Sequence, residues 1–287
     1  MIKCFHHTDL DGHCSGAIVK YFLPEAELYP LDYEDNFDFN LVSKDDTVYM
    51  IDVSLSVEEM KKLKESVYMF IFIDHHKARI LELDNNNVEL YGLQDWKSGN
   101  AACYLTWEFF SDKKVPKFID LISRYDTWRH NENVLNFYYG VSIYPTDPSD
   151  KDCILFNLLE DVDLLNSYIY SDTILDIIER GSTISKYIES VNKNIISKTA
   201  YVKEFEGLRF LVINYQSNSK VFDSIYDKNK HDGMIVYYYT GYVWKYSLYN
   251  NTDSEIDLSP IAIKYGGGGH MHACGFHTNK PIKELLN

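Results

Sequence analysis

The stretch IFIDHHKARI at residues 71–80 sets a polar triplet at the end of an apolar run. Its first three residues are typical of a buried strand, and Asp74, His75 and His76 follow them directly. A single Asp that closes a strand is more often a turn or capping residue than a ligand. The triplet therefore has two interpretations. It is a polar strand end, or it meets other carboxylates around a metal.

The first half of the chain alternates apolar strand patterns with helical patterns. In chain order, strand first, these patterns cover residues 1–7, 8–24, 46–55, 56–66 and 67–76. Ser56 is a candidate N-cap of the second helix, with Glu59 three residues later. Strand–helix–strand units of this kind build parallel sheets whose ligands bind at the carboxyl ends of the strands. The predicted fold class is α/β, with an N-terminal parallel-sheet domain.

The second half predicts a helical connector and a smaller, mixed α/β C-terminal domain. Helical spacing continues at 98–111 and 117–128, and a long amphipathic pattern at 168–200 has an expected interruption at Gly181. Strand pairs are then predicted around turns at Glu206-Gly207 and Thr240-Gly241, followed by a short helix that runs into a glycine loop. The expected divisions are a catalytic domain at 1–165, a helical linker at 166–200 and a C-terminal domain at 201–287.

Composition excludes several kinds of partner. A net charge of −15 argues against coating duplex DNA, because neutralising many phosphates requires clustered Lys and Arg. No apolar run approaches the ~20 residues of a membrane span, and the first residues do not resemble a signal peptide. We therefore expect a cytoplasmic protein without a membrane partner. The five cysteines form no C-x-x-C pair, which predicts reduced, mostly buried thiols.

Polar clusters follow all three predicted strands of the first half, and one further Asp follows a helix. The candidate metal ligands are His7, Asp9, Asp11, Asp52, His75 and Asp126. Taken singly, each has a structural alternative: Asp11 or Thr8 could cap a helix, and Asp52 could close a turn. Three successive strands that all end in metal-type residues favour a metal site over independent caps. Imidazole with carboxylates suits manganese, zinc or iron, and a carboxylate-rich set suits manganese or magnesium.

The order of these motifs resembles the DHH phosphoesterase superfamily. The motifs are His-x-Asp-x-Asp-Gly at 7–12, a strand-ending Asp52, Asp-His-His at 74–76 and a further Asp126. GGGGHMHACGF at 266–276 is similar to the glycine-rich segment of the C-terminal domain associated with that superfamily. The resemblance runs from about residue 3 to residue 277, with the motifs in the family's order.

The resemblance implies two divalent metal ions, with manganese first and magnesium, cobalt or iron as alternatives. One ion would be held by His7, Asp9 and Asp52. The other would be held by Asp11, His75 and Asp126 together with Asp52, which would bridge the two. Such ions would activate a water that attacks a phosphoester or phosphodiester bond, with no protein nucleophile.

The resemblance also implies that Asp74 and His76 are catalytic. Asp74 would orient His75, since a metal-bound imidazole commonly needs such a partner. His76 would face the phosphate and either donate a hydrogen bond to it or protonate the leaving oxygen. On this view the strand ends on Asp-His-His because each residue has its own position around the metals.

Substrate contacts are expected from the glycine run and from basic side chains. Glycines let a backbone approach a phosphate closely, although such a run can also be a flexible loop. Family members that act on oligonucleotides often carry an Arg on the preceding strand, where this chain has Tyr249. A phosphate clamp would then come from elsewhere, with Lys264 as one further candidate. The predicted substrate-binding residues are Gly266, Gly267, Gly268, Gly269, His270, Lys97 and Arg79.

The expected function is hydrolysis of short single-stranded oligonucleotides or of small nucleotides, such as a bisphosphate or a linear or cyclic dinucleotide. Inorganic pyrophosphatase and exopolyphosphatase activity are disfavoured, because the basic Arg-Lys-Lys run of those enzymes is absent. A homodimer is left open. The alternatives are a nucleotide-binding sensor without turnover and a catalytically silent DHH module.

Overall fold

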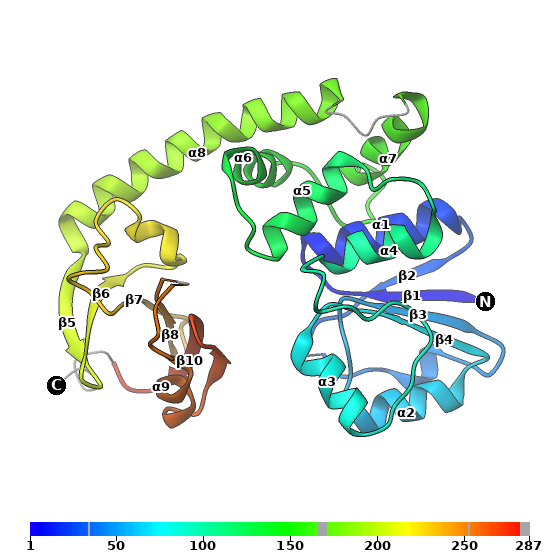
Figure 1. Ribbon diagram of the computed structural model, residues 1–287, viewed down its shortest axis with the longest axis horizontal. Coiled ribbons are helices and arrows are strands. Elements are labelled where there is room, and N and C mark those ends of the chain that lie inside the picture. The colour runs from blue at the N-terminus through cyan, green and yellow to red at the C-terminus, as the bar shows by residue number, and fades with distance from the viewer. Residues whose placement is uncertain (34, 166–170, 252, 282–287) are drawn as a thin grey trace. The chain divides into compact units, whose positions relative to one another are not determined.

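The computed structural model describes residues 1–33, 35–165, 171–251 and 253–281 (Figure 1). It divides into two compact units, Met1–Ser185 and Lys186–Asn287. The division falls inside the helix α8 (Asp172–Thr199). The sequence prediction treated all of 166–200 as a linker that belongs to neither domain. Residues 166–170 of that range lie outside the described part of the chain.

The N-terminal unit is built on a parallel sheet, as predicted, and this sheet has four strands. Its strands are β1 (Ile2–His6), β2 (Glu27–Pro30), β3 (Thr47–Ile51) and β4 (Met69–Ile73), in the order β2-β1-β3-β4. The helices α1 (Leu10–Phe22) and α2 (Val57–Ser66) lie between strands in the chain. Strand β2 was not predicted, because it is short and its two end residues are exposed.

Helices cover both faces of this sheet (Figure 1). Tyr49 and Ile51 of β3 pack with residues of α1 and of α4 (Ala102–Phe110) on one face. Val48 and Met50, which alternate with them, pack with α2 and with α3 (Lys77–Asn85) on the other face. A strand buried on both faces reads as a continuous apolar run, which is why the strand patterns were recognisable in the sequence.

The other predicted helical elements of this unit are present. The Ser56–Glu59 capping box closes the first turn of α2. Residues 117–128 contain α5 (Lys117–Asp126). The stretch between α5 and residue 165, which showed a mixed sequence pattern, holds α6 (Glu132–Val141) and α7 (Ile154–Leu165). The five cysteines are free and buried, as predicted.

Helix α8 continues through Gly181, so the predicted interruption there is wrong. A Cβ atom at Gly181 would lie 1.6 Å from the main-chain oxygen of Asn136 in α6. One at Gly140 would lie 1.9 Å from the main-chain oxygen of Ile177 in α8. The glycines therefore let two helices cross with their backbones in contact, and neither of them marks a break.

The C-terminal unit is a six-stranded sheet in the order β5-β6-β7-β8-β10-β9. All its neighbours are antiparallel except β6 and β7. The strands are β5 (Tyr201–Phe205), β6 (Leu208–Asn214), β7 (Gly233–Tyr239), β8 (Trp244–Tyr249), β9 (Gly268–His270) and β10 (Ala273–Thr278). The predicted hairpin turn is confirmed, with φ of 51° at Glu206 and 77° at Gly207.

The faces of this sheet are covered by short elements. The helix α9 (Ser259–Lys264) packs on one face through Ala262. Ile196 of α8 and Phe222 of the 3-10 helix η2 (Ser219–Phe222) pack on the other. A further 3-10 helix, η1 (Phe39–Leu41), belongs to the N-terminal unit.

The glycine run is only partly the loop that the sequence predicted. Gly268 and Gly269 belong to β9, which pairs with β10. A Cβ atom at Gly267 would lie 2.0 Å from the main-chain oxygen of Gly275, and one at Gly269 would lie 2.6 Å from Cα of Cys274. Close packing against β10 therefore requires two of these glycines, whatever else the run does.

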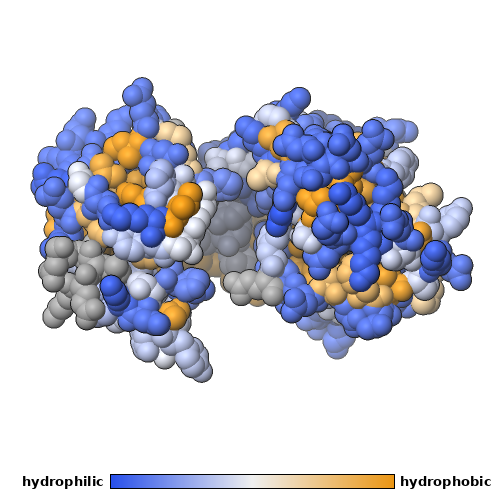
Figure 2. All heavy atoms as spheres, turned by 90° about the horizontal axis from the view of Figure 1, so that it is seen from below, coloured by the Kyte–Doolittle hydropathy of each residue, from blue (hydrophilic) through white to orange (hydrophobic). Residues whose placement is uncertain are grey.

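Hydrophilic residues predominate on the surface shown in Figure 2, in keeping with a chain in which 25% of the residues are charged. Among the described residues, no helix combines the length and the apolar character needed to cross a membrane.

We predict that Gly181→Ala lowers the free energy of unfolding by about 1–3 kcal/mol, because α6 and α8 must separate to admit the methyl group. The control is Ser182→Ala, one position along the same helix and partly exposed, which should change it by less than about 0.5 kcal/mol. Urea denaturation followed by circular dichroism measures both. Equal stability of the two variants would contradict the close helix crossing.

Candidate metal centre

The carboxyl ends of β1, β3 and β4 lie next to one another. The strand register brings the last residues of these strands to one level. The residues that follow them are His7, Asp52 and Asp74, whose side chains start close together because neighbouring strands are about 4.7–4.9 Å apart. The order β1-β3-β4 gives Asp52 the middle position.

Helix α1 brings two more carboxylates to this edge. Asp9 is its N-cap and accepts a hydrogen bond from the Gly12 N–H at 2.9 Å. Asp11, in the first turn, is 2% exposed and accepts hydrogen bonds from the N–H groups of Ala102 and Cys103, both at 2.9 Å. These N–H groups begin α4, which has no side-chain cap of its own. Asp11 therefore caps α4 from a distant part of the chain.

The first group of potential ligand atoms is formed by His7, Asp9 and Asp52, which all lie within 4.8 Å of one another. The Nδ1 atom of His7 is 3.2 Å from an oxygen of Asp9 and 3.7 Å from Oδ2 of Asp52. Burial opposes protonation of His7, but the carboxylates of Asp52 and Asp9 outweigh it and raise the pKa of His7 to about 10. The imidazole thus lies in a strongly negative environment.

The second group is formed by Asp11, His75 and Asp126. Nε2 of His75 lies 3.3 Å from Oδ2 of Asp126, 3.4 Å from Oδ1 of Asp52 and 3.8 Å from Oδ2 of Asp11. Asp126 reaches the site from the last residue of α5. Asp52 turns one carboxylate oxygen towards each group, so it lies between His7 and His75.

Asp52 is held in an unusual backbone conformation. Its φ of 62° lies in the left-handed region, which non-glycine residues rarely occupy. Its N–H donates to the main-chain oxygen of Ile73, which keeps the residue beside β4. Burial raises the pKa of Asp52 well above its usual range, although His7 acts in the opposite direction. A strained, buried carboxylate contributes nothing to stability by itself, which indicates a functional position.

The unpartnered atoms of the site fit a divalent cation. Within the described part of the chain, both carboxylate oxygens of Asp52, Nδ1 of His7 and Nε2 of His75 are buried and lack a hydrogen-bond partner. Buried polar atoms are normally hydrogen-bonded, because a buried polar atom without a partner costs free energy. Oxygen and imidazole-nitrogen ligands together suit manganese, iron or zinc.

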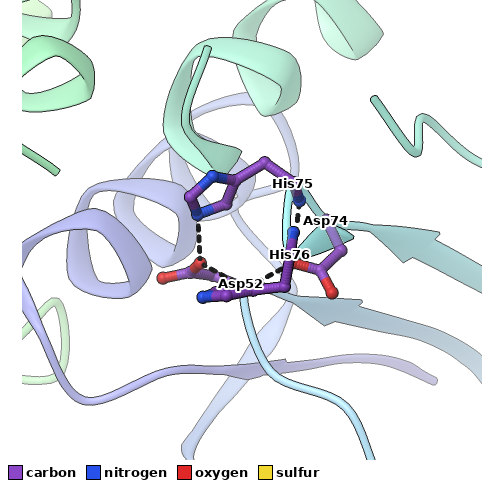
Figure 3. Close-up of side chains that lie close together, drawn as sticks. All are labelled: Asp52, Asp74, His75 and His76. Carbon is purple, nitrogen blue, oxygen red and sulfur yellow. Dashed lines mark hydrogen bonds and ion pairs between the residues drawn. The ribbon is translucent and has the colours of Figure 1, made fainter. Parts of the chain in front are cut away.

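The three residues of the opening motif take different positions (Figure 3). Asp74 is fully buried, and its Oδ1 accepts from the N–H groups of His75 and His76, at 2.8 and 3.1 Å. The same oxygen accepts from Nδ1 of His76 at 2.8 Å. The prediction that Asp74 orients the ring of His75 is therefore wrong. The ring that Asp74 orients belongs to His76.

This contact changes the character of His76. Burial opposes the protonated ring, but the hydrogen bond to Asp74 and its charge outweigh burial and raise the pKa of His76 to about 9. With Nδ1 held by Asp74, the other ring nitrogen is left for a ligand. The side chain is 39% exposed, so a ligand can reach it from solvent.

The predicted substrate-binding residues lie in both units and stay predictions. Arg79 is in α3 and pairs with Glu82 at 2.7 Å, and Nζ of Lys97 lies 5.4 Å from the ring centre of Trp96. Gly266 and His270 are exposed in the C-terminal unit. The further candidate Lys264 already pairs with Glu206, at 2.6 Å.

Sequence reasoning missed two residues that contact the site, Asp32 and Tyr33. An oxygen of Asp32 lies 3.7 Å from Nε2 of His7, and the hydroxyl of Tyr33 donates to the main-chain oxygen of Asp52 at 3.2 Å. Both residues follow β2, the strand that was not predicted. A prediction of β2 would have pointed to them, since they follow its carboxyl end.

We predict that Asp52→Asn lowers the affinity for Mn²⁺ by more than about 100-fold, a larger loss than outer partners of metal ligands cause. The variant should fold, because Asn tolerates the left-handed conformation and removes a buried charge. Isothermal titration calorimetry measures the affinity, and thermal unfolding without metal should occur at the wild-type temperature or above. Asp45→Asn, an exposed position before β3, is the control. Unchanged Mn²⁺ binding in Asp52→Asn would contradict the site.

Comparison with known proteins agrees with this arrangement. Residues 1–125 match the model described as DHH family, N-terminal domain. An uncharacterized protein of Acanthamoeba polyphaga mimivirus is 27% identical to this chain, and the match covers 96% of the chain. This chain spans only 66% of that relative's length.

Two solved structures share the fold. A pGpG-specific phosphodiesterase from Vibrio cholerae has a TM-score of 0.58 at 13% identity. The match covers 99% of this chain and 95% of the Vibrio chain. An exopolyphosphatase-related protein from Bacteroides fragilis has a TM-score of 0.53 at 13% identity, covering 99% and 88%. At such identity these likenesses show the fold alone. Residues 1–125, which carry most of the metal-type side chains described above, match the N-terminal domain of the DHH family.

Proposed function

We propose that the chain is a metal-dependent phosphoesterase that hydrolyses short oligonucleotides or small nucleotides with a water activated by two divalent ions. The observation that carries the proposal is the position of Asp52. Its two buried, unpartnered oxygens are directed to His7 on one side and His75 on the other. A carboxylate so placed is suited to bridge two ions, each completed by one of the two ligand groups.

Each of the two groups of ligand candidates would hold one ion. His7, Asp9 and Asp52 would hold one ion, and Asp11, His75 and Asp126 would complete the site of the other. Two such ions, when bound, supply a water of lowered pKa and neutralise phosphate oxygens. Manganese is the proposed metal, with magnesium, cobalt and iron as alternatives.

His76 is the proposed contact to the substrate phosphate. Asp74 fixes one nitrogen of its ring, so the remaining nitrogen has a defined direction from which to donate a hydrogen bond. It would stabilise charge on the phosphate or on the leaving oxygen. Asp74 acts as the positioning residue for this ring and for the two N–H groups beside it.

The proposed substrate class is small and single-stranded. A chain of net charge −15 is poorly suited to long contacts with nucleic acid. The Vibrio protein that shares the fold acts, by its name, on the linear dinucleotide pGpG. This supports including linear dinucleotides among the candidate substrates. We propose the exposed end of the glycine run, with His270, as further phosphate contacts.

The direct test is an assay of the purified protein with Mn²⁺ against di- to pentanucleotides, cyclic dinucleotides, an adenosine bisphosphate and pyrophosphate. Release of mononucleotide or phosphate is followed by chromatography. We expect turnover of one or more nucleotides and none of pyrophosphate. Binding without any turnover would overturn the hydrolase proposal and favour a nucleotide sensor.

We predict that His75→Ala lowers the hydrolysis rate by more than about 100-fold while the protein still folds, since the ring is a ligand candidate at the sheet edge and lies outside the hydrophobic core. Asp74→Ala should lose activity similarly and also lose about 1–3 kcal/mol of stability, because its N–H partners are left unpaired. His277→Ala, at an exposed position of β10, is the control. Wild-type rates in His75→Ala would contradict the assignment.

A further inference from the structure

We infer that the turn at Asp32 and Tyr33 is the outer positioning element of the metal centre. Asp32 fixes which nitrogen of His7 faces the ligand group, and Tyr33 holds the backbone of Asp52. The inference rests on the proposed function, because it assigns to these two residues a role at the same centre. It concerns metal affinity and ring orientation, which can be measured whether or not a substrate is known.

The two nitrogens of His7 face different carboxylates. Nδ1 faces Asp9 and Asp52, at 3.2 and 3.7 Å, whereas Nε2 faces Oδ1 of Asp32 at 3.7 Å. A neutral imidazole carries its proton on one nitrogen and offers a lone pair on the other. With a cation on the side of Asp9 and Asp52, the ring would keep its proton on Nε2, where the carboxylate of Asp32 lies 3.7 Å away. Metal-binding histidines commonly have such a partner on their second nitrogen.

Asp32 is well placed for this role because its own position is fixed. Its Oδ2 accepts from the hydroxyl of Thr8 at 3.1 Å, and its Oδ1 accepts from the N–H of Tyr33 at 2.7 Å. Its N–H donates to Asp35 at 2.8 Å. The side chain is 49% exposed, close to the 46% of Asp9, whereas Asp11 and Asp52 are almost fully buried. It therefore lies at the rim of the centre and contacts the ligand group through His7.

Tyr33 contacts the same centre from its other side. Its hydroxyl donates to the main-chain oxygen of Asp52 at 3.2 Å and lies 3.5 Å from Nδ1 of His76. Its ring centre is 5.1 Å from that of His7 and 6.1 Å from that of His76. A residue in the left-handed conformation needs contacts that hold it there, and this hydrogen bond is one of them. The contact with Asp52 gives the half-exposed Tyr33 a function at the rim.

The test for Asp32 compares Asp32→Asn and Asp32→Ala with Asp35→Asn, each at full chain length. Calorimetric titration with Mn²⁺ should show affinity reduced about 10–100-fold in Asp32→Ala, as for other outer partners of metal-bound histidines, and less in Asp32→Asn. Asp35→Asn loses a charge from the same turn but keeps an oxygen that can accept from the N–H of Asp32, and should stay within about twofold of the wild type. Nitrogen-15 NMR of the imidazoles, recorded with Mg²⁺ bound, should show the Nε2–H signal of His7 changed in both Asp32 variants and unchanged in Asp35→Asn.

Equal losses in Asp32→Asn and Asp35→Asn, with an unchanged His7 signal, would overturn the inference, because net charge or turn stability would explain both. If the wild type binds Mn²⁺ but hydrolyses no nucleotide, the proposed function fails. The comparison of affinities still decides the role of Asp32.

The test for Tyr33 is Tyr33→Phe, which keeps the ring and removes the hydroxyl. The affinity for Mn²⁺ should fall about fivefold, the equivalent of one lost hydrogen bond. Tyr68→Phe, at a surface position that is 75% exposed, should leave it unchanged. An affinity of Tyr33→Phe equal to that of the control would overturn the part of the inference that concerns Tyr33.

Discussion

Mutual repulsion among buried carboxylates is the constraint on which the rest of the structure depends. Asp11 and Asp52 are almost completely buried, and Asp126 approaches the same histidine nitrogen as both. Taking such charges out of water costs several kcal/mol each unless an opposite charge compensates them. Burial accordingly raises the pKa of all three. A cation at this position would offset these charges, and the cluster has the ligand atoms to hold one.

The parallel sheet brings these carboxylates together with little loss of conformational freedom. Three neighbouring strands end at one level, and their following residues need no long loops to meet. Helix N-termini supply part of the compensation. The N–H groups at the start of α4 donate to Asp11, and that of Gly12 donates to Asp9. Such N–H groups carry partial positive charge that favours carboxylates. In the described structure both oxygens of Asp52 lack a hydrogen-bond donor, and a cation would be a suitable partner for them.

Much of the fold and the candidate site could be predicted from sequence because the signals are local. Apolar runs followed by polar residues predict strand ends, and the order of the strands then brings His7, Asp52 and His75 together. What could not be predicted depends on contacts between distant segments. The crossing of α6 and α8 makes Gly181 a packing residue within a continuous helix. Asp74 orients His76 because of the backbone turn after β4, which residue spacing does not specify.

The charges around Asp52 bear on how an anionic substrate would bind. Of the predicted basic contacts in the N-terminal unit, Arg79 is paired with Glu82. The ionisable side chains grouped with Asp52 in the described structure are ligand candidates together with Asp74 and His76. An unneutralised carboxylate cluster would repel a phosphate, since like charges at such distances cost energy that water screens poorly in a buried site. Under the proposed function, divalent ions would therefore serve to bind the substrate as well as to activate water. The buried carboxylates hold the ions, and the ions in turn attract an anionic phosphate ester.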